Sequence, residues 1–212
     1  MNKSRVLVFA SYFAPNSFSE ALTNNKFVLS LKKSGYDVTV ITTSEYKGQQ
    51  YENSWSFLWS GIKENTYNIP SFEVDDVKKN LNKFKAVFNL KYPINGVSWS
   101  YKAYKLALKL HYQNPFDIVI SRSISDFGHL PALKFKKTVN IKWIANWNDP
   151  PFFIFPYPYN IKSNIINKLI YYRYIKSVSI YADFNTFPSE RLLNYMQKKL
   201  GLFNSNNCEI LP

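Results

Sequence analysis

The chain has 212 residues and a formal net charge of +13, from 27 basic and 14 acidic side chains. Hydrophobic residues make up 46% of it, which indicates a globular protein and excludes a largely disordered one. The single cysteine, Cys208, excludes an internal disulfide, and His111 and His129 are too isolated for metal-ligand spacing. No apolar run approaches the ~18 residues of a membrane span, and no signal peptide is recognisable, so we expect a cytoplasmic protein. We also expect it to hold no metal or cofactor.

Residues 5–42 predict a strand, a loop, a helix and a second strand. Residues 5–10 form an apolar run without strict alternation, and residues 38–41 are rich in β-branched side chains, as in strands buried on both faces. Such a unit crosses over right-handed within a parallel sheet, where ligands bind beyond the carboxyl ends of the strands. The loop of residues 11–19 is therefore a candidate site. The helix is expected from Phe18 to Lys33, with Phe18, Ala21, Leu22, Val28 and Leu29 on its apolar side, Asn25 as the polar exception and Gly35 as its stop.

The next part of the chain, residues 43–96, is polar, aromatic and poorly periodic. We expect it to elaborate one domain that spans residues 1–212. It includes a possible short strand at 67–69 and a basic helix at 75–90. The expected apolar positions are Val77, Leu81, Phe84, Val87 and Phe88 in that helix, and Tyr101, Tyr104, Leu108 and Leu110 in the helix at 97–112.

The regular pattern returns after Pro115. Strands are expected at 116–121, 141–146, 182–187 and 208–211, and helices at 127–137, 161–181 and 188–199. Repeated β–α units predict an α/β fold: a doubly wound, mostly parallel Rossmann-like sheet with helices on both faces. In the long helix the expected apolar stripe is Ile161, Ile165, Leu169, Tyr172 and Val178.

Polar side chains follow several predicted strands at their carboxyl ends. Since these ends share one edge of a parallel sheet, we expect the side chains to lie near one another. The candidates for substrate binding are Asn16, Ser17 and Glu20 after the first strand, Arg122 and Ser123 after the strand at 116–121, Asn148 after the strand at 141–146, and Ser189 and Glu190 after the strand at 182–187.

The pair Asn148-Asp149 stands out among these candidates because Trp147 and two prolines enclose it. The pair can accept hydrogen bonds from a sugar hydroxyl, and Asp149 can serve as a catalytic base. The alternative is an Asx-turn before Pro150. For Ser189 and for Asp126 a helix cap is the favoured interpretation.

Familiar motifs are missing from the chain. The first strand is not followed by the glycine fingerprint of dinucleotide-binding folds, and there is no Walker loop. No Gly-x-Ser-x-Gly elbow offers a hydrolase nucleophile.

The basic, aromatic stretch has two interpretations. It is either a surface for anionic headgroups or nucleic acid, or an ordinary amphipathic helix with a solvated lysine face, which the periodicity favours. Nucleic acid is the less favoured partner because no recognised binding motif accompanies the charge. The candidates for a membrane surface are Lys78, Lys79, Lys83, Trp55 and Trp59, together with Phe84 and Lys91.

Several segments, in this order, together resemble one known family. They are RVLVFASYFAP (5–15), LKKSGYDVTVIT (31–42), FDIVIS (116–121), WIANWNDP (143–150), ADFNTFPSE (182–190) and ILP (210–212). Together they resemble the N-terminal half of GT-B glycosyltransferases of the family 4, retaining type. One departure is the first loop, which reads Asn16-Ser17-Phe18-Ser19 where the family usually has Gly-Gly.

The resemblance implies an enzyme built of two Rossmann-like halves. The half seen here would bind a glycan or lipid-linked acceptor, and a C-terminal half, absent from this chain, would bind the nucleotide sugar. Residues 15–20 would lie near the donor phosphates, and Asp149 would face the reacting sugar as the catalytic residue. We expect a hexosyltransferase-like enzyme of bacterial surface polysaccharide assembly, at the inner face of the membrane, with the 212 residues inactive alone. The alternatives are a non-enzymatic half-module that needs a partner and, less favoured, a nucleic-acid-binding protein.

Overall fold

The computed structural model describes residues 3–15, 18–43, 60–70, 76–123, 127–156 and 164–211. Strands and helices alternate along most of it, and after the third strand two helices follow each other directly, as the sequence predicts. The strands are β1 (Arg5–Ala10), β2 (Asp37–Thr43), β3 (Thr66–Ile69), β4 (Ile118–Ser123), β5 (Lys142–Trp147), β6 (Phe184–Phe187) and β7 (Cys208–Ile210). The helices are α1 (Ser19–Lys33), α3 (Asp76–Leu90), α4 (Val97–Gln113), α5 (Leu130–Val139), α6 (Ile165–Tyr181) and α7 (Glu190–Leu200), with short 3-10 turns η2 (Lys63–Asn65), η3 (Phe152–Ile154) and η4 (Ser205–Asn207).

The strands form one seven-stranded sheet in the order β3-β2-β1-β4-β5-β6-β7. Every neighbouring pair is parallel, which confirms the predicted doubly wound α/β fold. The chain runs outward from β1 to β3, returns to place β4 beside β1, and then runs outward to β7. The junction of β1 and β4 is therefore the switch point of the sheet, beyond whose carboxyl ends ligands bind in such folds.

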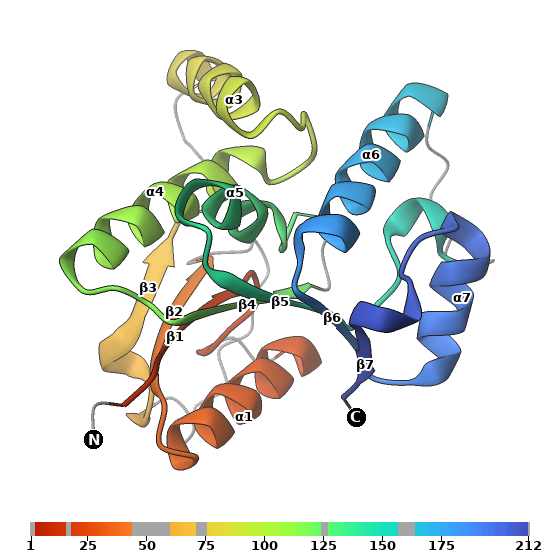
Figure 1. Ribbon diagram of the computed structural model, residues 1–212. Helices are drawn as coiled ribbons and strands as arrows, with labels where there is room; N and C mark the ends of the chain where they lie inside the picture. The colour runs from red at the N-terminus through yellow and green to blue at the C-terminus, as the bar shows by residue number, and fades with distance from the viewer. Residues whose placement is uncertain are drawn as a thin grey trace.

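Helices cover both faces of the sheet (Figure 1). In β1, Val6, Val8 and Ala10 belong to the core cluster under α1, whereas Leu7 and Phe9 belong to the larger core on the opposite face. That larger core lies beneath α4, α5 and α6 and includes the fully buried Trp99, Trp143 and Phe135. Burial on both faces explains why β1 lacks an alternating pattern.

Helix α1 differs from the predicted stripe. Its sheet-facing side includes Glu20, Asn24 and Asn25, all buried, whereas Phe18 precedes the helix and is 46% exposed. Leu22 and Leu29 are only half-buried. Ala21, Val28 and the polar exception Asn25 are buried as predicted, whereas the prediction was wrong for Phe18, Leu22 and Leu29. Polar side chains occupy the inner side of the helix where it approaches the carboxyl edge of β1 and β4. The predicted stop is confirmed: Gly35 has φ +93°, a conformation that favours glycine.

Helices α3 and α6 also depart from the expected amphipathic pattern. Among residues 81–90 of α3, the part whose side chains are described, Ala86 and Leu90 are buried, while the predicted apolar positions Leu81, Phe84 and Phe88 are exposed. In α6 burial begins only in its second half, and Ile165 and Leu169 are exposed. In α4 the inner positions are Val97, Trp99, Ala103, Tyr104 and Ala107, so Tyr101, Leu108 and Leu110 are only half-buried.

Some predicted site residues lie outside the described part of the chain: Asn16, Ser17, Asp126, Trp55 and Trp59, and the side chains of Lys78, Lys79 and Ser123. Within the described part, no helix is long and apolar enough to cross a membrane.

Candidate functional site

The register of the strands places a row of side chains at the carboxyl edge of the sheet. Ala10 of β1 is paired with Arg122 of β4, Arg122 with Asn146 of β5, and Asn146 with Thr186 of β6. Because paired residues of parallel strands point to the same face, the row continues the α1 side of the sheet. Strand β4 extends two residues beyond its predicted end, so Arg122 belongs to the strand and not to a loop.

Arg122 is a buried cation at the switch point. Only 5% of its surface is exposed, and its Nε donates a 2.5 Å hydrogen bond to Oδ1 of Asn24. Its guanidinium lies over the ring of Phe27, 4.4 Å from the ring centre. Burial lowers the pKa of Arg122 to about 10, although the nearby Glu20 carboxyl opposes the shift. The side chain therefore presents a fixed positive charge beneath the loop that follows β1.

Glu20 connects this cation to the loop after β5. Its Oε1 accepts a 2.6 Å hydrogen bond from Nδ2 of Asn148. Burial raises the pKa of the Glu20 carboxyl, while the Arg122 charge and the amides of Asn148 and Asn24 act in the opposite direction. Three predicted candidates, Glu20, Arg122 and Asn148, thus meet in one polar cluster with Asn24.

Two asparagines of α1 hold the loop that follows β1. Nδ2 of Asn24 donates to the carbonyl oxygen of Tyr12 at 2.8 Å, and Oδ1 of Asn25 accepts from the amide of Ala14 at 3.1 Å. On the other side of the loop, Oγ1 of Thr43 donates to the carbonyl oxygen of Ser11 at 2.5 Å. These bonds explain the polar inner side of α1, because buried loop amides and carbonyls need partners.

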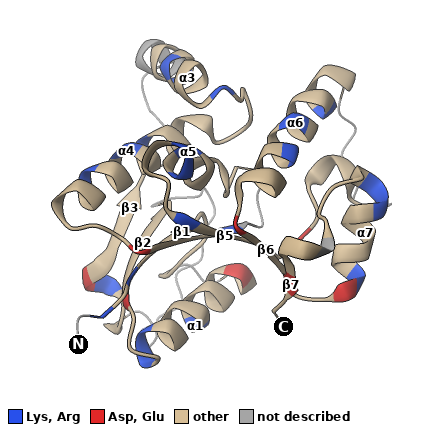
Figure 2. Cartoon of the chain, viewed as in Figure 1, with Lys and Arg blue, Asp and Glu red and all other residues tan. Residues whose placement is uncertain are grey.

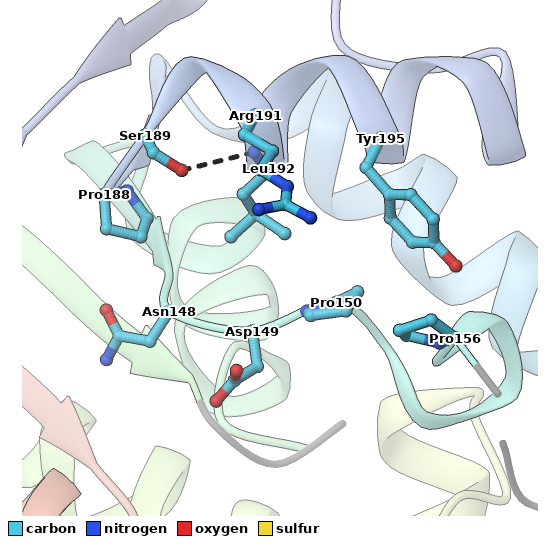
Figure 3. Close-up of a pocket in the computed structure, with 9 residues that line it drawn as sticks. All are labelled: Asn148, Asp149, Pro150, Pro156, Pro188, Ser189, Arg191, Leu192 and Tyr195. Carbon is cyan, nitrogen blue, oxygen red and sulfur yellow. Dashed lines mark hydrogen bonds between the residues drawn. The ribbon is translucent and has the colours of Figure 1, made fainter. Parts of the chain in front are cut away.

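A pocket of about 380 Å³ lies beside the cluster, between the loops that follow β5 and β6. Figure 3 shows Asn148 and Asp149 on one wall and side chains of α7 on the opposite wall. Its volume is near the lower end for small-molecule sites and is suited to about one sugar ring. It is lined by Asn148, Asp149, Pro150, Pro156, Pro188, Ser189, Arg191, Leu192 and Tyr195.

Asp149 is the carboxylate of this pocket. It is half-buried, and desolvation raises the pKa of its carboxyl. The adjacent Pro150 and Pro151 restrict the backbone that carries it. A carboxyl group with a raised pKa on a rigid loop can accept a proton from a bound hydroxyl, as general-base chemistry requires.

The α7 wall supplies both a structural cap and polar pocket groups. Oγ of Ser189 accepts from the amide of Leu192 at 3.3 Å, as the favoured cap interpretation predicts. The hydroxyl of Tyr195 donates to the carbonyl oxygen of Ile154, which joins α7 to η3 across the pocket. Glu190 is exposed and does not line the pocket.

Sequence reasoning missed several polar groups of this site. Asn24 was not among the candidates. Asn146 and Thr186 lie inside strands, where a polar residue is easily taken for an ordinary member of the sheet. Asn146 donates from Nδ2 to Oγ1 of Thr186 at 2.9 Å, while its buried Oδ1 has no hydrogen-bond partner among the described residues. A polar residue inside a strand buried on both faces was the available signal.

The described residues contain no group of three or more His, Cys, Asp or Glu side chains that could hold a metal ion.

No protein-family model matches the chain. No curated protein matches its sequence either. Among solved structures, it is similar to a putative UDP-N-acetylglucosamine 2-epimerase from Listeria monocytogenes, with a TM-score of 0.54 and 12% identity, over 98% of this chain and 44% of that one. It is also similar to MurG of Acinetobacter baumannii, with a TM-score of 0.50 and 13% identity, over 98% and 45% of the two chains.

A third similar structure is UGT73P12 of Glycyrrhiza uralensis in complex with glycyrrhetinic acid 3-O-monoglucuronide. The TM-score is 0.51 and the identity 12%, over 95% of this chain and 48% of that one. The chain therefore spans less than half the length of each of these structures. At such identities the likeness shows the fold, which is that of one Rossmann-like domain of a GT-B protein.

Proposed function

We propose that the chain is the acceptor-side half of a glycosyltransferase. The complete enzyme transfers a sugar from a nucleotide sugar to a glycan or lipid-linked acceptor in bacterial surface polysaccharide assembly. A second, donor-binding half completes the site, and the family 4, retaining type is the class that the sequence resembles. The enzyme works in the cytoplasm at the inner face of the membrane.

The observation that carries this proposal is the bond between Asn148 and Glu20. It joins the charged cluster at the switch point to the pocket that Asp149 lines, and this supports adjoining positions for a phosphate-bearing donor and a hydroxyl-bearing acceptor at one edge. Arg122 supplies positive potential on the donor side. In the pocket, Asp149 accepts a hydrogen bond from the attacking hydroxyl and takes up its proton as the hydroxyl oxygen bonds to the sugar. The bond between the sugar and the donor phosphate breaks in the same transfer, and the nucleotide leaves with its electron pair.

The test is sugar transfer by the native gene product, with a panel of labelled nucleotide sugars and bacterial membrane lipids as acceptors. Asp149→Asn is expected to lower turnover by roughly 10²–10⁴-fold, the range for loss of a general base. Glu209→Gln is the matched control, because Glu209 is exposed on β7 outside the pocket. Unchanged transfer in Asp149→Asn would remove Asp149 from the reaction.

The epimerase among the similar structures suggests a second activity on the same fold. An epimerase would convert the nucleotide sugar without any acceptor, whereas a transferase releases the nucleotide only as the acceptor is glycosylated. Chromatography of the labelled products separates the two outcomes.

A further inference from the structure

Helices α3 and α6 expose large apolar side chains on the helical side of the sheet. On α3, Leu81, Phe84 and Phe88 are 55%, 70% and 66% exposed. On α6, Ile165 and Leu169 are 74% and 58% exposed, and every residue from Asn164 to Leu169 is exposed. Several large exposed apolar side chains on neighbouring turns of a helix are typical of a surface that meets another apolar phase.

The same helices are almost entirely basic in charge. Asp76 is the only acidic residue in the sequences of α3, α4, α5 and α6. Figure 2 shows lysines and arginines on these helices and acidic residues on α1 and α7. The exposed cations nearest in sequence to the apolar side chains are Lys83, Lys85, Lys91 and Lys168. Nζ of Lys91 lies 4.3 Å from the ring centre of Phe88, so a positive charge lies directly beside this exposed aromatic ring.

The two helices are held in a fixed relation by the segment that follows α3. The hydroxyl of Tyr92 is hydrogen-bonded to Oγ of Ser177 on α6 at 2.6 Å, and its ring packs on that of Tyr174. The amide of Asn95 donates to the hydroxyl of Tyr171 at 3.3 Å. Figure 1 shows α3 and the N-terminal half of α6 rising on the same side of the sheet. The exposed side chains of the two helices thus lie on the same side of the sheet, and we call them together the α3–α6 surface.

We infer that the α3–α6 surface binds an anionic lipid bilayer. Aromatic and aliphatic side chains enter the boundary between headgroups and acyl chains, and the surrounding lysines meet the lipid phosphates. This inference deepens the membrane location in the proposed function and rests on it for its biological meaning. It adds α6 as a membrane contact and assigns the exposed apolar side chains of α3 to the bilayer.

A bilayer fits these features better than the other anionic partners. A nucleic acid would use the lysines but offers little to aliphatic side chains such as Ile165 and Leu169, because its affinity comes chiefly from phosphate contacts. An acidic protein partner would bind the lysines but would not bury the protruding aromatic rings beside them. The apolar side chains gain most where acyl chains replace water.

The experiment is sedimentation of the 212-residue chain with vesicles of phosphatidylglycerol or of phosphatidylcholine alone. We expect binding to phosphatidylglycerol vesicles that weakens as salt increases. The apolar variant Phe84→Ser/Phe88→Ser/Leu169→Ser should bind at least about tenfold more weakly. The charge variant Lys83→Glu/Lys85→Glu/Lys168→Glu should lose roughly fivefold or more per position at low salt.

Matched controls come from other parts of the chain. Phe184→Ser alters a side chain that is 46% exposed on β6, and Lys33→Glu/Lys198→Glu reverses two exposed charges on α1 and α7. Since all these positions are exposed, circular dichroism should show folded proteins. Controls that lose binding as strongly as the test variants, or a wild-type chain that ignores phosphatidylglycerol, overturn the inference.

Self-association that disappears in the apolar variant, without vesicle binding, also overturns it and assigns the surface to a second copy of the chain. Vesicle binding requires no sugar, and transfer to a water-soluble acceptor requires no vesicle. Failure of this inference and failure of the transferase proposal are therefore separate results.

Discussion

Nδ2 of Asn148 donates a 2.6 Å hydrogen bond to Oε1 of Glu20, although 128 positions separate the two residues in sequence. The bond connects the loop after β5 to the first turn of α1. Its acceptor is a buried carboxyl group near the buried guanidinium of Arg122, whose charge lowers the pKa of Glu20 against the larger effect of desolvation. The position of the pocket loop therefore depends on a charge at the switch point of the sheet.

Glu20→Ala should destabilise the protein by about 3 kcal/mol, because it leaves Arg122 buried without its nearby carboxylate and Asn148 without an acceptor. Glu20→Gln also removes the charge beside Arg122 but keeps an amide oxygen for Asn148, so its loss of stability should be about 1 kcal/mol smaller. Urea unfolding of the two variants measures the difference. Equal losses in both would mean that the carboxylate charge, which both variants remove, determines the role of Glu20, and not its volume or its acceptor oxygen.

Arg122→Lys should cost roughly 1–2 kcal/mol, although the charge is kept. An ammonium group cannot reproduce both the Nε bond to Asn24 and the flat contact with Phe27. The matched control is Arg173→Lys on the exposed part of α6, for which a change within about 0.5 kcal/mol is expected. If both changes have the same small effect on thermal unfolding, the planar contacts of Arg122 are unimportant.

The sheet could be predicted from the sequence because its strands are buried on both faces. Such strands are short, apolar and β-branched, and their order in the chain follows from the alternation with helices. Glu20, Arg122 and Asn148 could be identified because polar residues at carboxyl ends of parallel strands meet at one edge. Their direct contacts could not, because contact depends on side-chain direction across a helix, a strand and a loop that lie far apart in the sequence.

The helices show where periodicity fails. Asn25 was expected on the inner side, but Asn24 was not; both face inward because the loop after β1 needs hydrogen-bond partners, a requirement that an apolar stripe does not reveal. Phe84 and Ile165 face outward although their spacing matches a buried side. Periodicity identifies the apolar side of a helix but does not show whether that side packs against the protein core or lies at the surface. An apolar stripe on an exposed helix is therefore mistaken for core.

A buried histidine provides a pH-dependent prediction. His129 is fully buried; its Nδ1 is 2.7 Å from Oγ of Ser121, which also accepts a hydrogen bond from Nε1 of Trp143 at 2.8 Å. Desolvation lowers the pKa of His129 to about 3 from its ordinary value of 6.5. Because Ser121 has one hydroxyl hydrogen, and Nε1 of Trp143 is already its donor, that hydrogen is free to point at Nδ1. The neutral ring then accepts at Nδ1.

The folded protein should therefore lose stability in acid through this residue. Below pH 6.5 the unfolded chain binds a proton at His129 that the folded chain excludes until about pH 3, so the free energy of unfolding falls as the pH falls between these values. The expected contribution is about 2 kcal/mol between pH 7 and pH 5.

His129→Gln keeps an acceptor for Ser121 but does not titrate, so its urea-unfolding curves should shift less over this interval than those of the wild type. His111→Gln is the comparison, because His111 is less buried and its removal should leave the His129 contribution in place. An identical pH dependence in wild type and His129→Gln would show that the ring is accessible to protons in the folded state.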